Sequence, residues 1–458
     1  MSQLNRLGTD PIGKLLIKMT LPACTGMLVI MLYNIVDTIF VGHYAGSMAI
    51  AGMSVVLPVS MLLPTLGMAI GVGSSSIISR SLGARDFDKA RLAFGNAVSL
   101  ALVVGVGASL ISAVFATEIL YIFGGRDEIL PHALEYYLII MLGIPFFGAW
   151  MCMNNTLRAE GLTRQAMKGM FLSSFLNVGL DVVFIIVLGM GLKGAAIATV
   201  ISQITGLLYS ISFYRSGKSH MQFKSGYFRL NRAILRETVF LGASTFGRQG
   251  AGSAMVILLN QSLLLYGGAV AVAVYGILHR IVSLVFVPVI GMTQGFLPIA
   301  SYNYGAGQLD RVREVIFKSI AFGTVVCFIM AVFIWLFPEL LIGLFTQDAT
   351  LIELGSEGLK TIIVLMPLAA SQSIAAGYFQ AIGRPVAAFI LTISRQVLML
   401  IPLLYILPKF FELKGVWLAF PVADFLACAL TVTVFIRELP RLKNCQGADT
   451  SRQEPLLN

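Results

Sequence analysis

Twelve long apolar segments joined by short polar connections constrain the fold of this chain more than any other feature of its sequence. A helix of about 20 apolar residues spans the roughly 30 Å hydrocarbon layer of a membrane. Hydrophobic residues make up 57% of the chain and charged residues only 12%, about half the usual charged share of a soluble domain. The sequence therefore predicts an all-α membrane protein with twelve transmembrane helices. We expect them at about residues 13–42, 47–78, 92–123, 130–157, 165–190, 193–214, 234–266, 269–300, 314–346, 357–382, 385–409 and 414–437.

Lysine and arginine residues gather on one side of these predicted helices. The N-terminus, the connections after even-numbered helices and the Arg215–Arg236 stretch carry most of them. Because cytoplasmic connections are rich in Lys and Arg, we expect both termini to be cytoplasmic. We expect the protein to lie in the cytoplasmic (inner) membrane of a bacterium or archaeon. The net charge of +10 therefore reflects membrane topology, and no basic domain indicates nucleic-acid binding.

The two halves of the chain repeat each other. Six helices per repeat give both halves the same orientation, so the repeat is parallel, and transporters built in this way bind substrate between their halves. We therefore expect two parallel six-helix repeats around a central cleft: an N-lobe over residues 1–214, a cytoplasmic basic linker over 215–233, a C-lobe over 234–440 and a cytoplasmic tail over 441–458. The matching segments, at an offset of 221 or 222 residues, are Tyr44–Ala51 with Tyr266–Ala273, Gly83–Arg91 with Gly305–Arg313, Ala159–Gly161 with Ala381–Gly383, and Leu192–Gly194 with Leu413–Gly415.

Two acidic residues lie within the apolar segments of the first half, Asp37 and Asp181. Ionisable residues inside a membrane are costly and mark functional sites by default. Asn177 lies one helical turn before Asp181 on the same face, and Thr199 of the 193–214 segment lies at a similar depth. Two carboxylates, an amide and a hydroxyl at one level can hold a proton or a small hard cation such as Na⁺. The alternative is that polar neighbours satisfy both acids, which then have only a structural role.

The second half lacks this acid pair and instead places three arginines and one aspartate near mid-depth. Unpaired arginines there would be costly, so we expect Asp424 to pair with Arg280 or Arg395. Two interpretations stay open, an ion-pair network that fixes helix packing and a site that contacts substrate. The residues assigned to a substrate cavity are Tyr33, Asn34, Arg248, His279, Arg280, Gln372, Arg395 and Asp424.

Five segments of this sequence resemble those of the multidrug and toxic-compound extrusion (MATE) transporters, in the branch typified by DinF and MepA. The similarity runs from about residue 7 to about residue 440. It implies a two-lobe membrane fold and the efflux of amphipathic, often cationic compounds, driven by an inward H⁺ or Na⁺ gradient. The segments that carry it are Leu7–Leu16, Leu32–Gly42, Tyr275–Arg280, Gln294–Pro298 and Asn303–Gly307.

The resemblance also implies roles for individual residues. The residues that bind the coupling ion in this branch correspond to Asp37, Asn177, Asp181 and Thr199. Pro22 lacks an amide N–H, which permits a kink, and it corresponds to the proline implicated in bending of the first helix. Simple tolerance of a proline in a membrane helix is the alternative. The acidic residues that the NorM-type branch carries in its seventh and tenth helices are missing here, and a histidine replaces the usual asparagine of the eighth helix.

The leading interpretation is a secondary active antiporter that exports small drug-like molecules, in the lipid bilayer, as a monomer and without a cofactor beyond H⁺ or Na⁺. The runner-up is a flippase for lipid-linked precursors from the same superfamily, which the three C-lobe arginines favour and the count of twelve helices disfavours. An integral membrane enzyme would need clustered His, Cys or Asp at a membrane face, and the sequence shows no such cluster.

Overall fold

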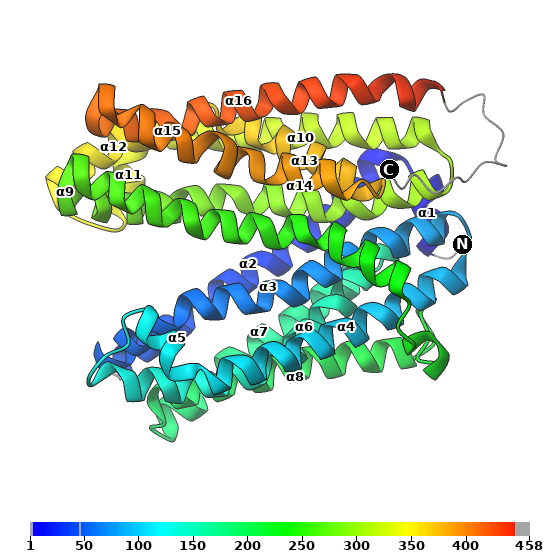
Figure 1. Ribbon diagram of the computed structural model, residues 1–458, viewed down its shortest axis with the longest axis horizontal. Coiled ribbons are helices and arrows are strands. Elements are labelled where there is room, and N and C mark those ends of the chain that lie inside the picture. Colours follow the sequence, from blue (N-terminus) through cyan, green and yellow to red (C-terminus); the bar gives the residue numbers. More distant parts are fainter. Residues whose placement is uncertain (1–2, 45–46, 445–458) are drawn as a thin grey trace.

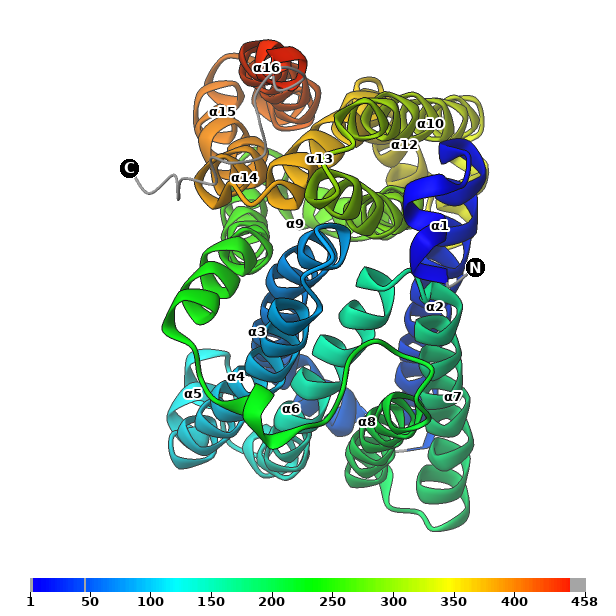
Figure 2. The same cartoon turned by 90° about the vertical axis from the view of Figure 1, so that its right-hand side faces the viewer.

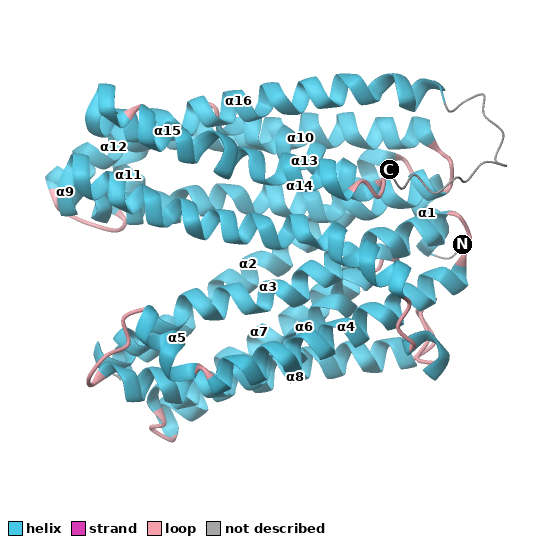
Figure 3. Cartoon of the chain, in the orientation of Figure 1, coloured by secondary structure: helices cyan, strands magenta, loops and turns pink. Residues whose placement is uncertain are grey.

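The computed structural model describes residues 3–44 and 47–444 of the 458-residue chain, and within these ranges the chain is helical apart from short turns and loops (Figure 3). Positions 45–46 of the first repeat segment and positions 445–458 of the predicted tail lie outside the described residues. The first half forms α1 (Gln3–Thr9), α2 (Ile12–Tyr44), α3 (Ser47–Gly83), α4 (Phe87–Val114), α5 (Ala116–Ile122), α6 (Ile129–Ala159), α7 (Thr163–Asp181), the π-helix η1 (Val182–Val187) and α8 (Gly191–Arg215).

The second half begins with a loop that contains the short 3₁₀ helix η2 (Ser225–Phe228). It continues as α9 (Arg232–Gly305), α10 (Leu309–Leu336), α11 (Pro338–Gly343), α12 (Ala349–Ile363), α13 (Met366–Ala381), α14 (Pro385–Ile393), the π-helix η3 (Ser394–Leu400), α15 (Ile401–Ile406) and α16 (Pro408–Asn444).

Among the described residues, ten helices are long and apolar enough to cross a membrane, or eleven when the bent pair α12 and α13 counts as one span. Helix α9 has 74 residues, about 110 Å at 1.5 Å per residue, which is more than twice the membrane thickness. It is broken at Gly268, where φ is 66° and ψ is −167°, a conformation that suits glycine. Since α9 passes twice, the spans amount to the twelve that the sequence predicts, and the all-α membrane fold is confirmed.

Two predicted spans prove shorter than their apolar segments. The 92–123 segment is broken at Phe115 into α4 and α5, and the 314–346 segment is broken at Phe337 into α10 and α11. Pro338 explains the second break, because a proline disfavours helical geometry in the residue before it. The predicted span at 357–382 is likewise bent by 45° between α12 and α13, where a proline occupies the first turn of α13.

Backbone geometry repeats at the offset found in the sequence. The breaks at Phe115 and Phe337 are 222 residues apart. Gly161 and Gly383, separated by the same 222 residues, have positive φ angles of 80° and 81°. These matching irregularities show that the two halves share a backbone design as well as a sequence pattern.

The helices form two layers, α2 to α8 (blue to green) and α9 to α16 (green to red), which converge at the end where α1 begins and α16 ends and diverge toward the other end (Figure 1). Figure 2 looks onto the convergent end, where the loop between α8 and α9 crosses the first layer. The loop is held there by Asn96 of α4, whose Oδ1 accepts a hydrogen bond from the Asn231 N–H at 2.6 Å.

The layers touch most closely through glycines near the convergent end. A Cβ atom on Gly83 of α3 would lie 2.0 Å from the carbonyl oxygen of Tyr302, and one on Gly305 of α9 would lie 2.0 Å from the carbonyl oxygen of Arg80. The Arg80 guanidinium also forms an ion pair with Glu237 of α9 at 2.6 Å. Because only glycine permits this approach of two backbones, α3 and α9 cross in close contact at this end.

Candidate functional site

The two acids predicted in the first half lie on neighbouring helices. Helix α2 positions Asp37, and α7, which packs along α2, positions Asp181 at its last residue. The exposed fraction is 4% for Asp37 and 0% for Asp181, and the two carboxylates lie close enough to interact electrostatically. Asn177, one turn before Asp181 and also buried, donates through Nδ2 to Thr199 Oγ1 of α8 at 3.5 Å. The four residues predicted to couple an ion are therefore brought together from three helices.

Oxygen atoms without donors distinguish this cluster. One carboxylate oxygen of Asp37, both of Asp181 and the amide oxygen of Asn177 are buried and accept no hydrogen bond from the described residues. A buried carboxylate that is neither paired nor hydrogen-bonded is costly in its ionised form. The cluster thus presents acceptors that a proton or a hard cation would satisfy, since carboxylate and amide oxygens are the ligands that hard cations prefer.

Two tyrosines complete the surroundings of the acids. Tyr33 lies one turn before Asp37 on α2, and Tyr136 comes from α6; both interact electrostatically with Asp37 and Asp181. Tyr136 is buried, and sequence reasoning missed it because nothing distinguishes it from the other aromatic residues of its apolar segment. Asn34, assigned to the substrate cavity, is exposed and donates to the Ile30 carbonyl oxygen of its own helix at 2.7 Å.

Helix α2 runs unbroken through Pro22, so the permitted kink does not appear as a break in this structure. The residues on either side of the proline contact the second layer. Thr20 Oγ1 lies 3.7 Å from the Met292 sulfur, and a Cβ on Gly291 would lie 2.2 Å from the Cys24 sulfur. Pro22 is therefore placed where α2 packs against α9, and a bend there would change the contact between the layers.

The charged residues of the second half are only partly paired. Asp424 of α16 pairs with Arg395, one of the two partners that the sequence allowed, and not with Arg280. The Arg395 guanidinium also lies over the Phe286 ring at 5.5 Å. Arg395 is the second residue of the π-helix η3, and Asp181 immediately precedes the π-helix η1. Each layer thus carries a charged residue within or next to a π-helix, an element frequent at functional sites.

The other residues assigned to the substrate cavity differ in surroundings. Arg248, His279 and Arg280 are exposed, and neither arginine forms an ion pair with any described residue. His279 Nδ1 lies 3.5 Å from the hydroxyl of Tyr275. Gln372 is buried, and its amide donates to the Leu391 carbonyl oxygen at 3.2 Å and to Ser394 Oγ at 3.1 Å, so its polar group is used in helix packing.

Another buried acid, Glu160, lies at the C-terminal end of α6 and was not singled out in the sequence. Its exposed fraction is 1%, and its carboxylate accepts from Ser219 Oγ at 2.7 Å and from the His220 N–H at 2.8 Å. Burial raises the pKa of Glu160 to about 7, although these hydrogen bonds act to lower it. Glu160 therefore fastens the loop between α8 and α9 to the first layer through a carboxylate that titrates near neutral pH.

Comparison with known proteins identifies the family. The model of the MatE family matches residues 22–183 and 252–406, which include Asp37, Asp181 and Arg395. This chain belongs to the MATE family. The "Multidrug export protein MepA" of Staphylococcus aureus (strain N315) is 30% identical to it over 436 residues, 95% of each chain.

Solved MATE structures share the fold over almost the whole chain. A "Crystal structure of MATE in the bent conformation" superposes with a TM-score of 0.92 at 27% identity and covers 98% of this chain and 100% of the other. An "Outward-facing conformation of a multidrug resistance MATE family transporter of the MOP superfamily" superposes with a TM-score of 0.91 at 27% identity, over 98% and 99% of the two chains. The family resemblance is confirmed, and the chain is a multi-pass MATE transporter and not an enzyme.

Proposed function

We propose that this MATE transporter is an antiporter that exports small amphipathic, drug-like compounds and is driven by H⁺ or Na⁺ at Asp37, Asn177, Asp181 and Thr199. The observation that carries the proposal is the group of buried oxygens without donors that Asp37, Asn177 and Asp181 share. Such a group has a strong electrostatic reason to take up a proton or a cation. The export function of the MepA relatives, given in their names, supports the direction of transport.

In this proposal the two layers are the N-lobe and C-lobe, and transport alternates access between them. The tight crossing of α3 and α9 closes the cytoplasmic side, with both termini and the linker in the cytoplasm, as the distribution of Lys and Arg indicates. The state is then open to the outside, in agreement with the outward-facing MATE structure that it resembles. Ion uptake neutralises Asp37 and lowers the cost of its burial, which favours a bend of α2 at Pro22 and closure of the N-lobe.

The decisive test is dye efflux from proteoliposomes in which the pH gradient and the Na⁺ gradient are imposed separately. Wild-type protein should move dye uphill with at least one gradient. Asp37→Asn keeps the size of the side chain and mimics the neutral state, so it should reach the membrane and bind substrate but should not transport uphill. Normal uphill efflux by Asp37→Asn would remove this residue from the mechanism.

The contribution of the two lobes is tested in the same vesicles. Asp181→Asn should abolish gradient-driven efflux. Gln372→Ala, which changes a buried amide in the other lobe, should alter substrate preference and leave coupling intact. Comparable loss of coupling in both variants would contradict an ion site confined to the first lobe.

A flippase for lipid-linked precursors is the second candidate. The observation that favours it is the pair of exposed, unpaired arginines Arg248 and Arg280, since a guanidinium is well suited to binding phosphate. If the protein is a flippase, replacing both arginines by Gln should abolish translocation of a fluorescent lipid diphosphate. Vesicles with wild-type protein should then show no gradient-driven dye efflux. The antiporter proposal predicts the opposite result for both assays.

A further inference from the structure

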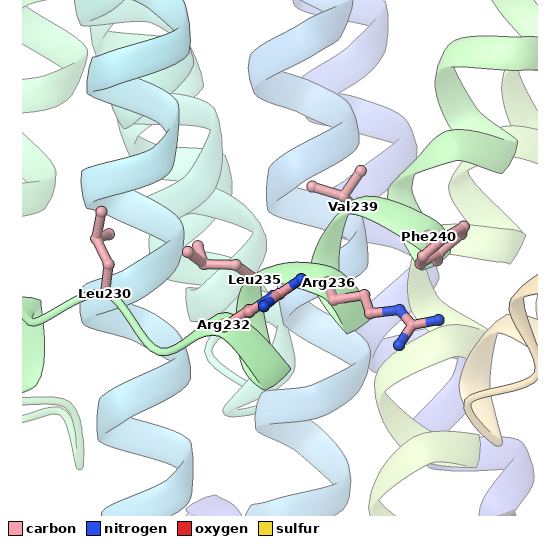
Figure 4. Close-up of a pocket in the computed structure, with 6 residues that line it drawn as sticks. All are labelled: Leu230, Arg232, Leu235, Arg236, Val239 and Phe240. Atoms are coloured by element: carbon pink, nitrogen blue, oxygen red, sulfur yellow. The ribbon is translucent and has the colours of Figure 1, made fainter. Parts of the chain in front are cut away.

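A groove of about 480 Å³ lies at the start of α9, away from the ion site. Its six lining residues come from a single stretch of chain, the end of the α8–α9 loop and the first turns of α9 (Figure 4). They are Leu230, Arg232, Leu235, Arg236, Val239 and Phe240.

The five groove residues within α9 occupy one face of the helix. Their spacing of three and four residues stacks their side chains in a stripe. The arginines Arg232 and Arg236 are at the loop end of the stripe, and Val239 and Phe240 follow farther along the helix, toward the middle of the span. From Arg232 to Phe240 the helix rises about 12 Å. The groove is therefore cationic at the end of the transmembrane helix and apolar at greater depth.

This face has no partner in the described part of the chain. Val239 is 52% exposed and Phe240 is 49% exposed. The Arg236 guanidinium lies over the Phe240 ring at 5.6 Å, and neither Arg232 nor Arg236 forms an ion pair with a described residue. The adjacent acid, Glu237, is paired with Arg80 of α3 on the side that faces the first layer. The positive charge of the groove is thus left without a counter-charge.

We propose that this groove binds an anionic phospholipid, whose phosphodiester lies between Arg232 and Arg236 and whose acyl chain runs along Leu235, Val239 and Phe240. Charge complementarity selects the headgroup, because arginines beside a membrane attract anionic lipids. The apolar continuation of the groove selects a lipid over a free phosphate ion. The same helical turns carry the Arg80–Glu237 contact on the side that faces the first layer, so the bound lipid supports the convergent end of the molecule from outside.

A matched control is available in α10. Arg313 is also exposed and also lies over a phenylalanine one turn later, Phe317, at 5.8 Å. The neighbouring positions Val312 and Ile316 are buried, and the position one turn before Arg313, which corresponds to Arg232, is Leu309. Arg313→Gln therefore removes one positive charge from the start of α10 and leaves the two-arginine groove at the start of α9 unchanged.

The test is native mass spectrometry of the full-length protein, stripped of lipid in a neutral detergent and titrated with phosphatidylglycerol or with phosphatidylcholine of the same acyl chains. Wild-type protein should bind phosphatidylglycerol more tightly. The Arg232→Gln/Arg236→Gln double variant should lose roughly thirtyfold in that affinity, about fivefold per arginine, and keep its phosphatidylcholine binding, which shows that it is folded. Arg313→Gln should stay within about twofold of wild type.

Three results would overturn the proposal. Equal phosphatidylglycerol affinity of the double variant and wild type would mean that the arginines do not bind the headgroup. A loss of about fivefold in Arg313→Gln, the loss assigned to each groove arginine, would mean a general effect of surface charge. Displacement of phosphatidylglycerol by millimolar inorganic phosphate would mean that the arginines bind a free anion and that the apolar part of the groove contributes nothing.

Discussion

Replacing Glu160 by Gln should remove most of the pH dependence of stability at the convergent end of the molecule. The carboxyl is 1% exposed, and burial raises its pKa from 4.5 to about 7. At 1.36 kcal/mol per unit, this difference corresponds to roughly 3 kcal/mol. Because the pKa is raised in the folded protein, the stabilisation is fully present below pH 4.5 and is lost as the pH rises through about 7.

The assay is thermal unfolding of purified protein in detergent between pH 5 and pH 8. The wild-type melting temperature should fall as the pH rises across this range, whereas that of Glu160→Gln should change little, because Gln stays neutral and its Oε1 can still accept from the His220 N–H. Ser219→Ala is the matched control. It removes a hydrogen bond of 2.7 Å that favours the ionised carboxylate, so it should move the wild-type transition to higher pH. An unchanged pH profile in Glu160→Gln would refute the assignment of this titration to Glu160.

Three further predictions test the packing and the topology. Gly83→Ala should lower the melting temperature and reduce the free energy of unfolding by about 1–3 kcal/mol, because the new Cβ would lie 2.0 Å from a backbone oxygen. Gly107→Ala should leave the melting temperature unchanged, because no neighbour lies within 4 Å of that Cβ. Arg395→Met should destabilise the protein by about 3–5 kcal/mol, since it leaves the buried Asp424 carboxylate unpaired. Adding Asp424→Asn should recover most of the loss. Equal melting temperatures of the single and double variants would contradict this. Lys224→Cys, at an exposed position of the linker, should resist an impermeant thiol reagent applied to intact cells, and ready labelling would invert the topology.

Tertiary structure decided the features that depend on which helices are neighbours. Hydropathy gives the depth of a residue in the membrane but not the direction in which it points, so it left Asp424 with two possible partners, and only the packing of η3 against α16 selects Arg395. For the same reason Tyr136 was missed, since its place beside the acids depends on α6. Glu160 appeared as an ordinary polar residue after a helix until the α8–α9 loop was seen to fold over it.

The sequence by itself determined the class of the protein, the number of membrane passes, the internal repeat and the list of residues from which an ion site could be built. Hydropathy and charge act locally along the chain, because each segment must suit the polarity of the membrane at its own depth. Asp37 and Asp181 therefore stand out as acids within apolar segments of the linear sequence. The close crossing of α3 and α9 at the convergent end was beyond this kind of inference. The sequence marks Gly83 and Gly305 only as matching positions of the repeat. Their role arises because α3 and α9 cross with their backbones in contact, a geometry set by the packing of both layers together.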